Sequence, residues 1–148
     1  MNDFFMNVAI DLAKVAYSNG EIPVGAVIVK NNTIISSAFN KCQIDRKCTR
    51  HAEIIAIEKA CEIIGDKYLD GCEMYVTLEP CAMCAGAIIN ARISRLYFGA
   101  FEKESGACGS VVNLFLSTNA YKKTDVFPGC MEEECRRLMT DFFRKELR

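Results

Sequence analysis

Four residues in two short motifs have the types and the spacing of a catalytic metal site. His51, the only histidine of the chain, is followed two residues later by Glu53, and the run Pro80-Cys81-Ala82-Met83-Cys84 lies further along. One imidazole and two thiolates make three zinc ligands, which leaves the open fourth position that catalytic zinc sites keep. The residues therefore predict a zinc site at His51, Cys81 and Cys84, beside which the Glu53 carboxylate moves protons.

The chemistry that such a site performs is hydrolysis. A water molecule at the open position of a zinc ion has its pKa lowered to about 7, which makes hydroxide available near neutral pH. Glu53 would accept the proton of this water, and the hydroxide would attack a ring carbon that bears an amino group. Glu53 would then deliver protons to the ring nitrogen and to the departing ammonia. The motifs thus predict hydrolytic deamination.

Two other interpretations of the cysteines stay open at this point. A Cys-x-x-Cys pair also occurs in redox sites and in structural metal sites. A closed, structural zinc site would need a fourth ligand, for which Cys48 and Cys108 are available. Such a site has no use for Glu53, so the complete set of four residues favours the catalytic interpretation.

The helices expected around the motifs explain how the ligands meet. Pro80 is typical of a first helical turn and predicts a helix over about 80–91, in which i, i+3 spacing puts both cysteine sulfurs on one face. A second helix is predicted over about 51–64, with His51 at its start. The ligands would lie where two helix N-termini meet, and the positive end of a helix lowers the pKa of a thiol. Glu53 does not share a helix face with His51, so it is not expected to be a ligand.

The rest of the chain alternates between expected strands and helices. Periodic apolar residues predict a helix over 3–19, and β-rich runs around Asn31-Asn32 predict a hairpin of strands 24–29 and 33–39. Further strands are expected at 73–78, 94–99 and 124–127, a short helix at 111–116, and a last helix from about 131. This order predicts a single α/β domain over residues 1–148, in which a hairpin is followed by parallel strands.

Composition and charge limit the partners and the compartment. Hydrophobic residues make up 51% of the chain, enough for a substantial core, and no apolar run approaches the roughly 20 residues of a membrane helix. The nine cysteines are an odd number and the N-terminus lacks the features of a signal peptide, so reduced thiols and a cytoplasmic location are expected. The net charge of −1 excludes a general basic field for nucleic acid.

One stretch of the chain does gather positive charge. Lys41, Arg46, Lys47 and Arg50 lie in the irregular segment 41–50, which contains a single acidic residue. The segment is either a solvated loop or, because it immediately precedes His51, a phosphate-binding lip on the site.

Longer runs around the motifs resemble a known family. The runs are Pro23-Val24-Gly25-Ala26-Val27, His51-Ala52-Glu53-Ile54, residues 77–87, residues 95–100 and Asp141-Phe142-Phe143-Arg144. Within them, the pattern H-x-E…P-C-x-x-C is that of zinc-dependent nucleobase deaminases. With these flanks, nearly the whole chain resembles the bacterial tRNA-specific adenosine deaminases (TadA type) of the cytidine-deaminase-like superfamily.

The resemblance implies a fold, a reaction and an assembly. The fold is a three-layer α/β/α sandwich of the cytidine deaminase-like type with a central five-stranded mixed sheet, and the protein is a homodimer. The reaction is the conversion of adenosine to inosine at the wobble position of a tRNA anticodon. The implied partner is therefore a tRNA anticodon stem-loop, and the implied cofactor is one Zn²⁺ per subunit.

The resemblance also implies roles for individual residues. His51, Cys81 and Cys84 bind zinc, Glu53 is the proton shuttle, and Asn40 hydrogen-bonds the flipped base. The other residues implied at the substrate are Val24, Ala52, Leu78, Phe39 and Glu102. An anticodon loop is single-stranded, so local contacts suffice to hold it. Such RNA-backbone contacts are expected from Arg46, Lys47, Arg50, Phe143 and Arg144.

The chain departs from the family pattern at three places near the expected RNA. Phe39 stands where tryptophan is usual, Lys47-Cys48 replaces a common Asp-Pro, and Phe101-Glu102 replaces a usual Arg-Asp pair. These changes leave the expected chemistry intact and affect only the expected RNA contacts. Two other functions stay open, because they share the zinc site. One is deamination of a free nucleobase or nucleoside, such as guanine or cytosine, which needs no basic rim. The other is a non-catalytic, zinc-stabilised RNA-binding module.

Overall fold

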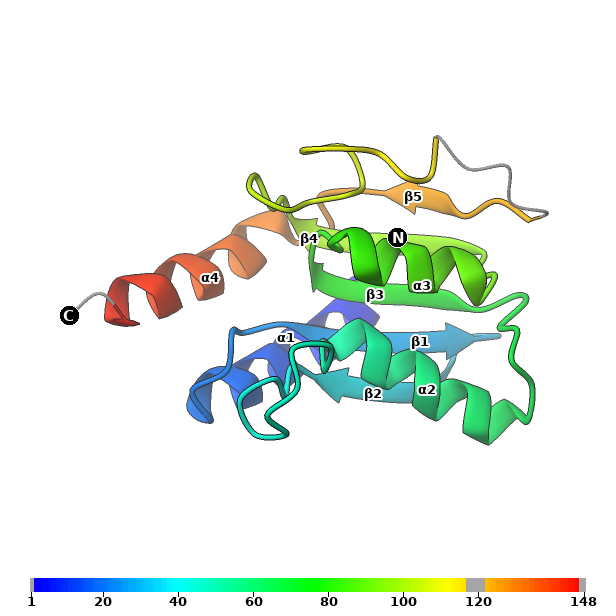
Figure 1. Ribbon diagram of the computed structural model, residues 1–148, viewed down its shortest axis with the longest axis horizontal. Helices are drawn as coiled ribbons and strands as arrows, with labels where there is room; N and C mark the ends of the chain where they lie inside the picture. Colours follow the sequence, from blue (N-terminus) through cyan, green and yellow to red (C-terminus); the bar gives the residue numbers. More distant parts are fainter. Residues whose placement is uncertain (1, 117–121, 147–148) are drawn as a thin grey trace.

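A mixed five-stranded sheet forms the centre of the protein (Figure 1). The computed structural model describes residues 2–116 and 122–146. The strands are β1 (Gly25–Lys30), β2 (Thr33–Phe39), β3 (Glu73–Leu78), β4 (Arg95–Ala100) and β5 (Asp125–Phe127), in the spatial order β2-β1-β3-β4-β5. β1 pairs antiparallel with β2 and β3, whereas β4 runs parallel to both β3 and β5. The predicted hairpin followed by parallel strands is confirmed.

Helices cover both faces of the sheet (Figure 1). On one face α1 (Asp3–Ser18) contacts α4 (Glu132–Glu146), and on the other α2 (Ala52–Ile64) contacts α3 (Ala82–Asn90). These three layers confirm the expected α/β/α sandwich. In the described part of the chain, no helix combines the length and the apolar character that crossing a membrane requires.

Alternation along the strands divides the core into two layers, because successive strand residues point to opposite faces. In β1, Ala26 and Ile28 belong to the core on the side of α2 and α3, and Val27 and Val29 to the core on the side of α1. The Asn31-Asn32 turn of the hairpin has φ angles of 50° and 60°, the left-handed conformation that asparagine tolerates. The asparagine pair thus closes the hairpin in the way that the sequence predicts.

The strand ends next to the predicted site lie together at one edge of the sheet. Phe39 at the end of β2 pairs with Gly25 at the start of β1. The Gly25 N–H donates to Oγ1 of Thr77, near the end of β3, at 3.2 Å. A Cβ atom at Gly25 would lie 2.0 Å from the Ala9 carbonyl oxygen, so only glycine lets α1 lie this close. The segments that lead into α2 and α3 therefore leave the sheet at the same edge.

The short helix predicted over 111–116 is wrong. The segment consists of turns and bends and includes a bridge between Cys108 and Asn113. The Val111 N–H donates to the Gly106 carbonyl at 3.0 Å, and the Leu114 N–H donates to the Ala107 carbonyl at 3.1 Å. The segment folds back on the preceding loop instead of forming a helical turn, a choice that a short apolar run does not reveal.

Candidate metal centre

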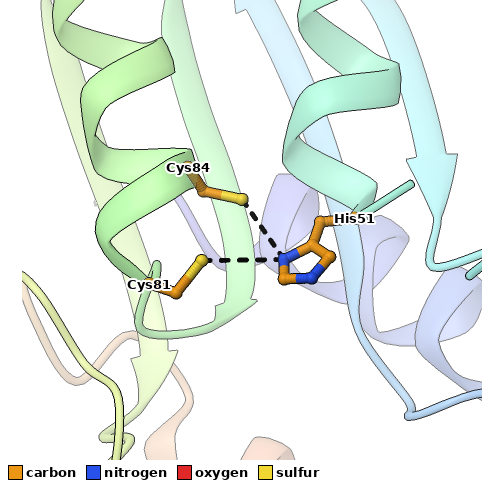
Figure 2. A group of neighbouring side chains, drawn as sticks. All are labelled: His51, Cys81 and Cys84. Carbon is orange, nitrogen blue, oxygen red and sulfur yellow. Dashed lines mark hydrogen bonds between the residues drawn. The ribbon is translucent and has the colours of Figure 1, made fainter. Parts of the chain in front are cut away.

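The three predicted ligands come together where α2 and α3 begin (Figure 2). The Nδ1 atom of His51 lies 3.7 Å from Sγ of Cys81 and 3.4 Å from Sγ of Cys84. All three ligand atoms lie within 4.8 Å of one another. Among the residues that the structure describes, this is the one cluster of three or more His, Cys, Asp or Glu side chains placed to hold a metal ion.

Each of the two helices begins with a residue of this group at its N-cap. His51 has φ −70° and ψ 150°, Cys81 has φ −73° and ψ 177°, and neither side chain caps its own helix. N-cap side chains commonly accept a hydrogen bond from the first turn. Here they point across the space between the helices instead, and the next turn brings Cys84 to the same face. This confirms that the predicted ligands meet at two helix N-termini.

The spacing of the group fits a tetrahedral zinc ion. With a Zn–S bond of about 2.3 Å and a Zn–N bond of about 2.0–2.1 Å, a tetrahedral angle separates sulfur from nitrogen by about 3.6 Å. The observed separations of 3.4 and 3.7 Å bracket this value. Thiolate and imidazole are also a donor set that suits zinc. The residues present therefore fit the predicted metal.

Neither of the cysteines considered as a fourth ligand belongs to the group. Cys48 is exposed in the loop before His51. Cys108 is buried, and its thiol donates a weak hydrogen bond to the Pro80 carbonyl at 3.9 Å. The geometry thus gives no support to a closed, structural site. Instead of a fourth ligand, a cavity lies beside the group, and His51 and Cys81 line it.

The pKa values of the two thiols of the group move in opposite directions. The hydrogen bond with Cys84, assisted by His51, lowers the pKa of Cys81 to about 4. The same hydrogen bond, together with burial, raises the pKa of Cys84. The prediction that the pKa of both thiols is lowered is therefore wrong for Cys84, and hydrogen bonds with Cys84 and His51 are the causes that lower the pKa of Cys81. A zinc ligand is a thiolate, so metal binding displaces the proton of Cys84.

Glu53 is a buried carboxylic acid beside the group. Its side chain is 4% exposed on the first turn of α2. Burial is the main cause that raises the pKa of Glu53, whereas a hydrogen bond with the Cys84 thiol acts in the opposite direction. Glu53 is not part of the metal-binding cluster, as its spacing from His51 predicts. A carboxyl group with a raised pKa binds a proton more readily than an ordinary glutamate, which suits it to accept and return protons.

A cavity of about 140 Å³ opens beside His51, Glu53 and Cys81. Five of the six residues predicted at the substrate also line it: Val24, Asn40, Ala52, Leu78 and Glu102. Phe143, a predicted contact of the RNA backbone, lines it as well. Cys84 is not among the lining residues and is fully buried. The Asn40 amide donates to the Ile22 carbonyl at 3.3 Å and accepts from the Cys42 N–H at 3.4 Å. These two contacts hold Asn40 in the cavity wall.

The structure places the other predicted residues outside this cavity. Phe39 is half-buried, and the Lys41 ammonium group lies 5.0 Å from the centre of its ring. Arg46, Lys47 and Arg144 are exposed. Arg50 differs from them because it forms ion pairs with Asp45 at 3.2 Å and Glu58 at 3.3 Å, so its charge is balanced within the protein.

Four lining residues escape the sequence reasoning: Ile22, Glu79, Ser105 and Met139. Met139 lies one helical turn before Phe143 on α4, and this i, i+4 spacing is a signal that could have found it. Ile22 precedes Val24 by two residues, the period of an extended chain. Glu79 and Ser105 carry no comparable signal, because their positions depend on how a loop folds back onto the metal-binding turn.

We expect zinc content to distinguish the predicted ligands from the other cysteines. Cys81→Ser removes one of three ligands and should lower the bound zinc at least about tenfold from about one ion per chain. Cys48→Ser and Cys108→Ser are matched controls that should keep it. Elemental analysis after dialysis measures the zinc, and its loss from Cys108→Ser would instead support a closed site.

Known proteins share both the motifs and the fold. Residues 1–100 match the family model for the cytidine and deoxycytidylate deaminase zinc-binding region. A tRNA-specific adenosine deaminase of Bacillus subtilis (strain 168) is 41% identical over 144 residues, which cover 97% of this chain and 89% of that protein. This likeness extends well beyond the metal-binding motifs.

Two solved structures extend the comparison. One belongs to work on A-to-I editing by tRNA:A34 deaminases at the wobble position of transfer RNA. It matches with a TM-score of 0.89 and 40% sequence identity, and the match covers 93% of this chain and 99% of the other chain. A guanine deaminase of Bacillus subtilis has a TM-score of 0.67 and 30% identity, over 98% and 95% of the two chains. With its zinc-ligand set and this near full-length similarity, the chain belongs to the cytidine and deoxycytidylate deaminase family and, within it, to the zinc-dependent tRNA-specific adenosine deaminases.

Proposed function

We propose that this protein converts adenosine to inosine at the wobble position of a tRNA anticodon. The observation that carries the proposal is the cavity in which the predicted ligands His51 and Cys81, the buried acid Glu53 and the amide of Asn40 meet. The tRNA-specific adenosine deaminases that share nearly the full length of the chain support the choice of substrate. We further propose that His51, Cys81 and Cys84 are the zinc ligands.

The reaction that we propose consumes one water molecule and releases one ammonia molecule. Zinc bound by these residues would supply the Lewis acidity that lowers the pKa of water from about 15.7 to about 7 and makes it a nucleophile near neutral pH. Glu53 accepts the proton that the attacking water loses and gives it to the ring nitrogen of the adenine base. Glu53 then takes the remaining proton of that water from the hydroxyl group now on the ring carbon and passes it to the leaving amine, so that the carbonyl of inosine forms as the bond between carbon and the exocyclic nitrogen breaks. Its buried position shields these transfers from bulk solvent.

The walls of the cavity suit a flat, partly polar base. Val24, Ala52 and Leu78 offer apolar surface for the two faces of the ring. The Asn40 amide has a second N–H and a second lone pair beyond the two hydrogen bonds that it makes within the protein. Asn40 can therefore hydrogen-bond the edge of a base without giving up the contacts that hold it in place.

We also propose that the protein acts as a homodimer in the cytoplasm, as its resemblance to the family implies. All nine cysteines are free thiols, which suits a reducing compartment. The mass of the protein in solution, measured by sedimentation equilibrium, tests the dimer, and a monomeric mass at micromolar concentration contradicts it.

The substrate is tested with one RNA and several free bases. An adenosine-containing anticodon stem-loop should yield inosine, whereas free adenine, guanine and cytosine should remain unchanged; chromatography of the products measures both. A stem-loop that carries its adenosine in the paired stem is the matched control, because flipping a paired base out of a duplex costs a few kcal/mol. Turnover of the free bases alone would favour the second candidate function, which the similarity to a guanine deaminase suggests.

The proposed proton transfer is tested with Glu53→Gln. The variant should keep its zinc, since Glu53 is outside the metal-binding cluster, and should lose about 10²–10⁴-fold in single-turnover rate because it cannot accept a proton. Glu62→Gln, on the exposed side of the same helix, is the control and should react at the wild-type rate. A wild-type rate for Glu53→Gln would remove Glu53 from the mechanism.

The proposed RNA contacts are tested by the salt dependence of binding. The double variant Arg46→Gln, Lys47→Gln should flatten the plot of log affinity against log salt by about 1.4, since each contact with a single strand contributes about 0.7. The control is Arg95→Gln, at the start of β4, whose charge pairs with Glu73. An unchanged slope in the double variant would show that segment 41–50 is only a solvated loop.

A further inference from the structure

Glu79 is a buried carboxylate that the proposed chemistry does not use. It directly follows β3, precedes Pro80 and is 2% exposed. A buried carboxylate is costly unless donors surround it. The donors that surround Glu79 identify what it does.

Four hydrogen bonds converge on the two oxygens of Glu79. Oε1 accepts the Glu102 N–H at 3.1 Å and the Ser110 hydroxyl. Oε2 accepts the Cys108 N–H at 3.0 Å and the Ser110 N–H at 3.1 Å. A carboxylate has about four acceptor positions, so these donors leave it little capacity for a substrate. All of them belong to the segment 101–110 after β4, which is called the β4 loop below.

The β4 loop lies directly on the metal-binding turn. Gly106 forms a bridge with Cys81, and the Ala107 N–H donates to the Pro80 carbonyl at 2.9 Å. A Cβ atom at Gly106 would lie 2.5 Å from the carboxyl group of Glu79, which leaves no room for a side chain there. The carboxylate thus contacts the middle of the loop closely at Gly106 and holds both of its ends, at Glu102 and Ser110.

The β4 loop also forms part of the cavity wall, through Glu102 and Ser105. We propose that Glu79 is a positioning residue: by holding the β4 loop, its carboxylate sets where Glu102 and Ser105 stand and so governs how tightly the cavity holds its substrate. The effect on substrate affinity rests on the function proposed above. The effect on the loop rests on the hydrogen bonds alone.

The substitution Glu79→Gln separates the donors, because an amide has one oxygen and one NH₂ group. If the NH₂ group replaces Oε1, the Ser110 hydroxyl can rotate to accept from it, and one backbone donor, the Glu102 N–H, loses its partner. If it replaces Oε2, the N–H groups of Cys108 and Ser110 both lose theirs. The first arrangement leaves fewer buried donors unpaired and is the one expected.

Amide hydrogen exchange measured by NMR tests this arrangement without any substrate. In Glu79→Gln the Glu102 amide should exchange at least about tenfold faster, while Cys108 and Ser110 keep their protection. For the stem-loop, KM should rise about tenfold with kcat changed less than about threefold, because the variant loses uniform binding rather than transition-state stabilisation. The matched control is Glu73→Gln, at the start of β3, whose carboxylate contacts Arg95 and Tyr97 instead.

The results decide whether Glu79 holds the β4 loop, takes part in the chemistry or does neither. Unchanged Glu102 exchange and unchanged KM would overturn the inference, and so would a fall in kcat at constant KM, which assigns Glu79 to the chemistry. If Glu79→Gln does not fold, Ser110→Ala takes its place; it removes one donor and should raise KM about threefold, and no rise overturns the inference. If the wild-type protein leaves the stem-loop unchanged, the proposed function fails, whereas the exchange experiment still tests the loop.

Discussion

The site depends on one geometric constraint: two helices must begin at the same edge of the sheet, close enough for their first side chains to touch. The adjacent strands β1 and β3 provide this, because the end of β2, the start of β1 and the end of β3 are joined at that edge through Phe39, Gly25 and Thr77. His51 and Cys81 then occupy N-cap positions that point toward each other. The packing of the two helices on the sheet thus determines the distances between the predicted ligands.

Two buried glutamates near this edge have different environments and hence different roles. Glu53 lies beside the thiols, and burial raises its pKa, so its carboxyl group is prepared to carry protons. Both oxygens of Glu79 accept hydrogen bonds from the β4 loop, so its carboxylate is prepared to hold backbone in place. The two acids are thus separated by their neighbours: Glu53 borders the thiols and the cavity, whereas four hydrogen bonds from the β4 loop occupy the oxygens of Glu79.

Sequence reasoning succeeds where a residue type has few uses and fails where tertiary contacts decide. A lone histidine, a Cys-x-x-Cys pair after proline and an asparagine pair between β-rich runs predict the cluster and the hairpin, because each satisfies a local rule. Arg50 looks like its basic neighbours, yet two carboxylates take up its charge. The opposite pKa shifts of the two thiols and the folded-back segment 111–116 likewise arise from contacts that no local pattern encodes.

The placement of the ligands on two separate helices has a mechanical consequence. His51 belongs to the antiparallel half of the fold, with β1, β2 and α2, whereas Cys81 begins the parallel half, with α3 and β4. A metal ion between them is a crosslink across 30 residues of chain, and a crosslink stabilises a fold by restricting its unfolded ensemble. The ion that supplies the chemistry would thereby also connect the two halves of the fold beside the cavity.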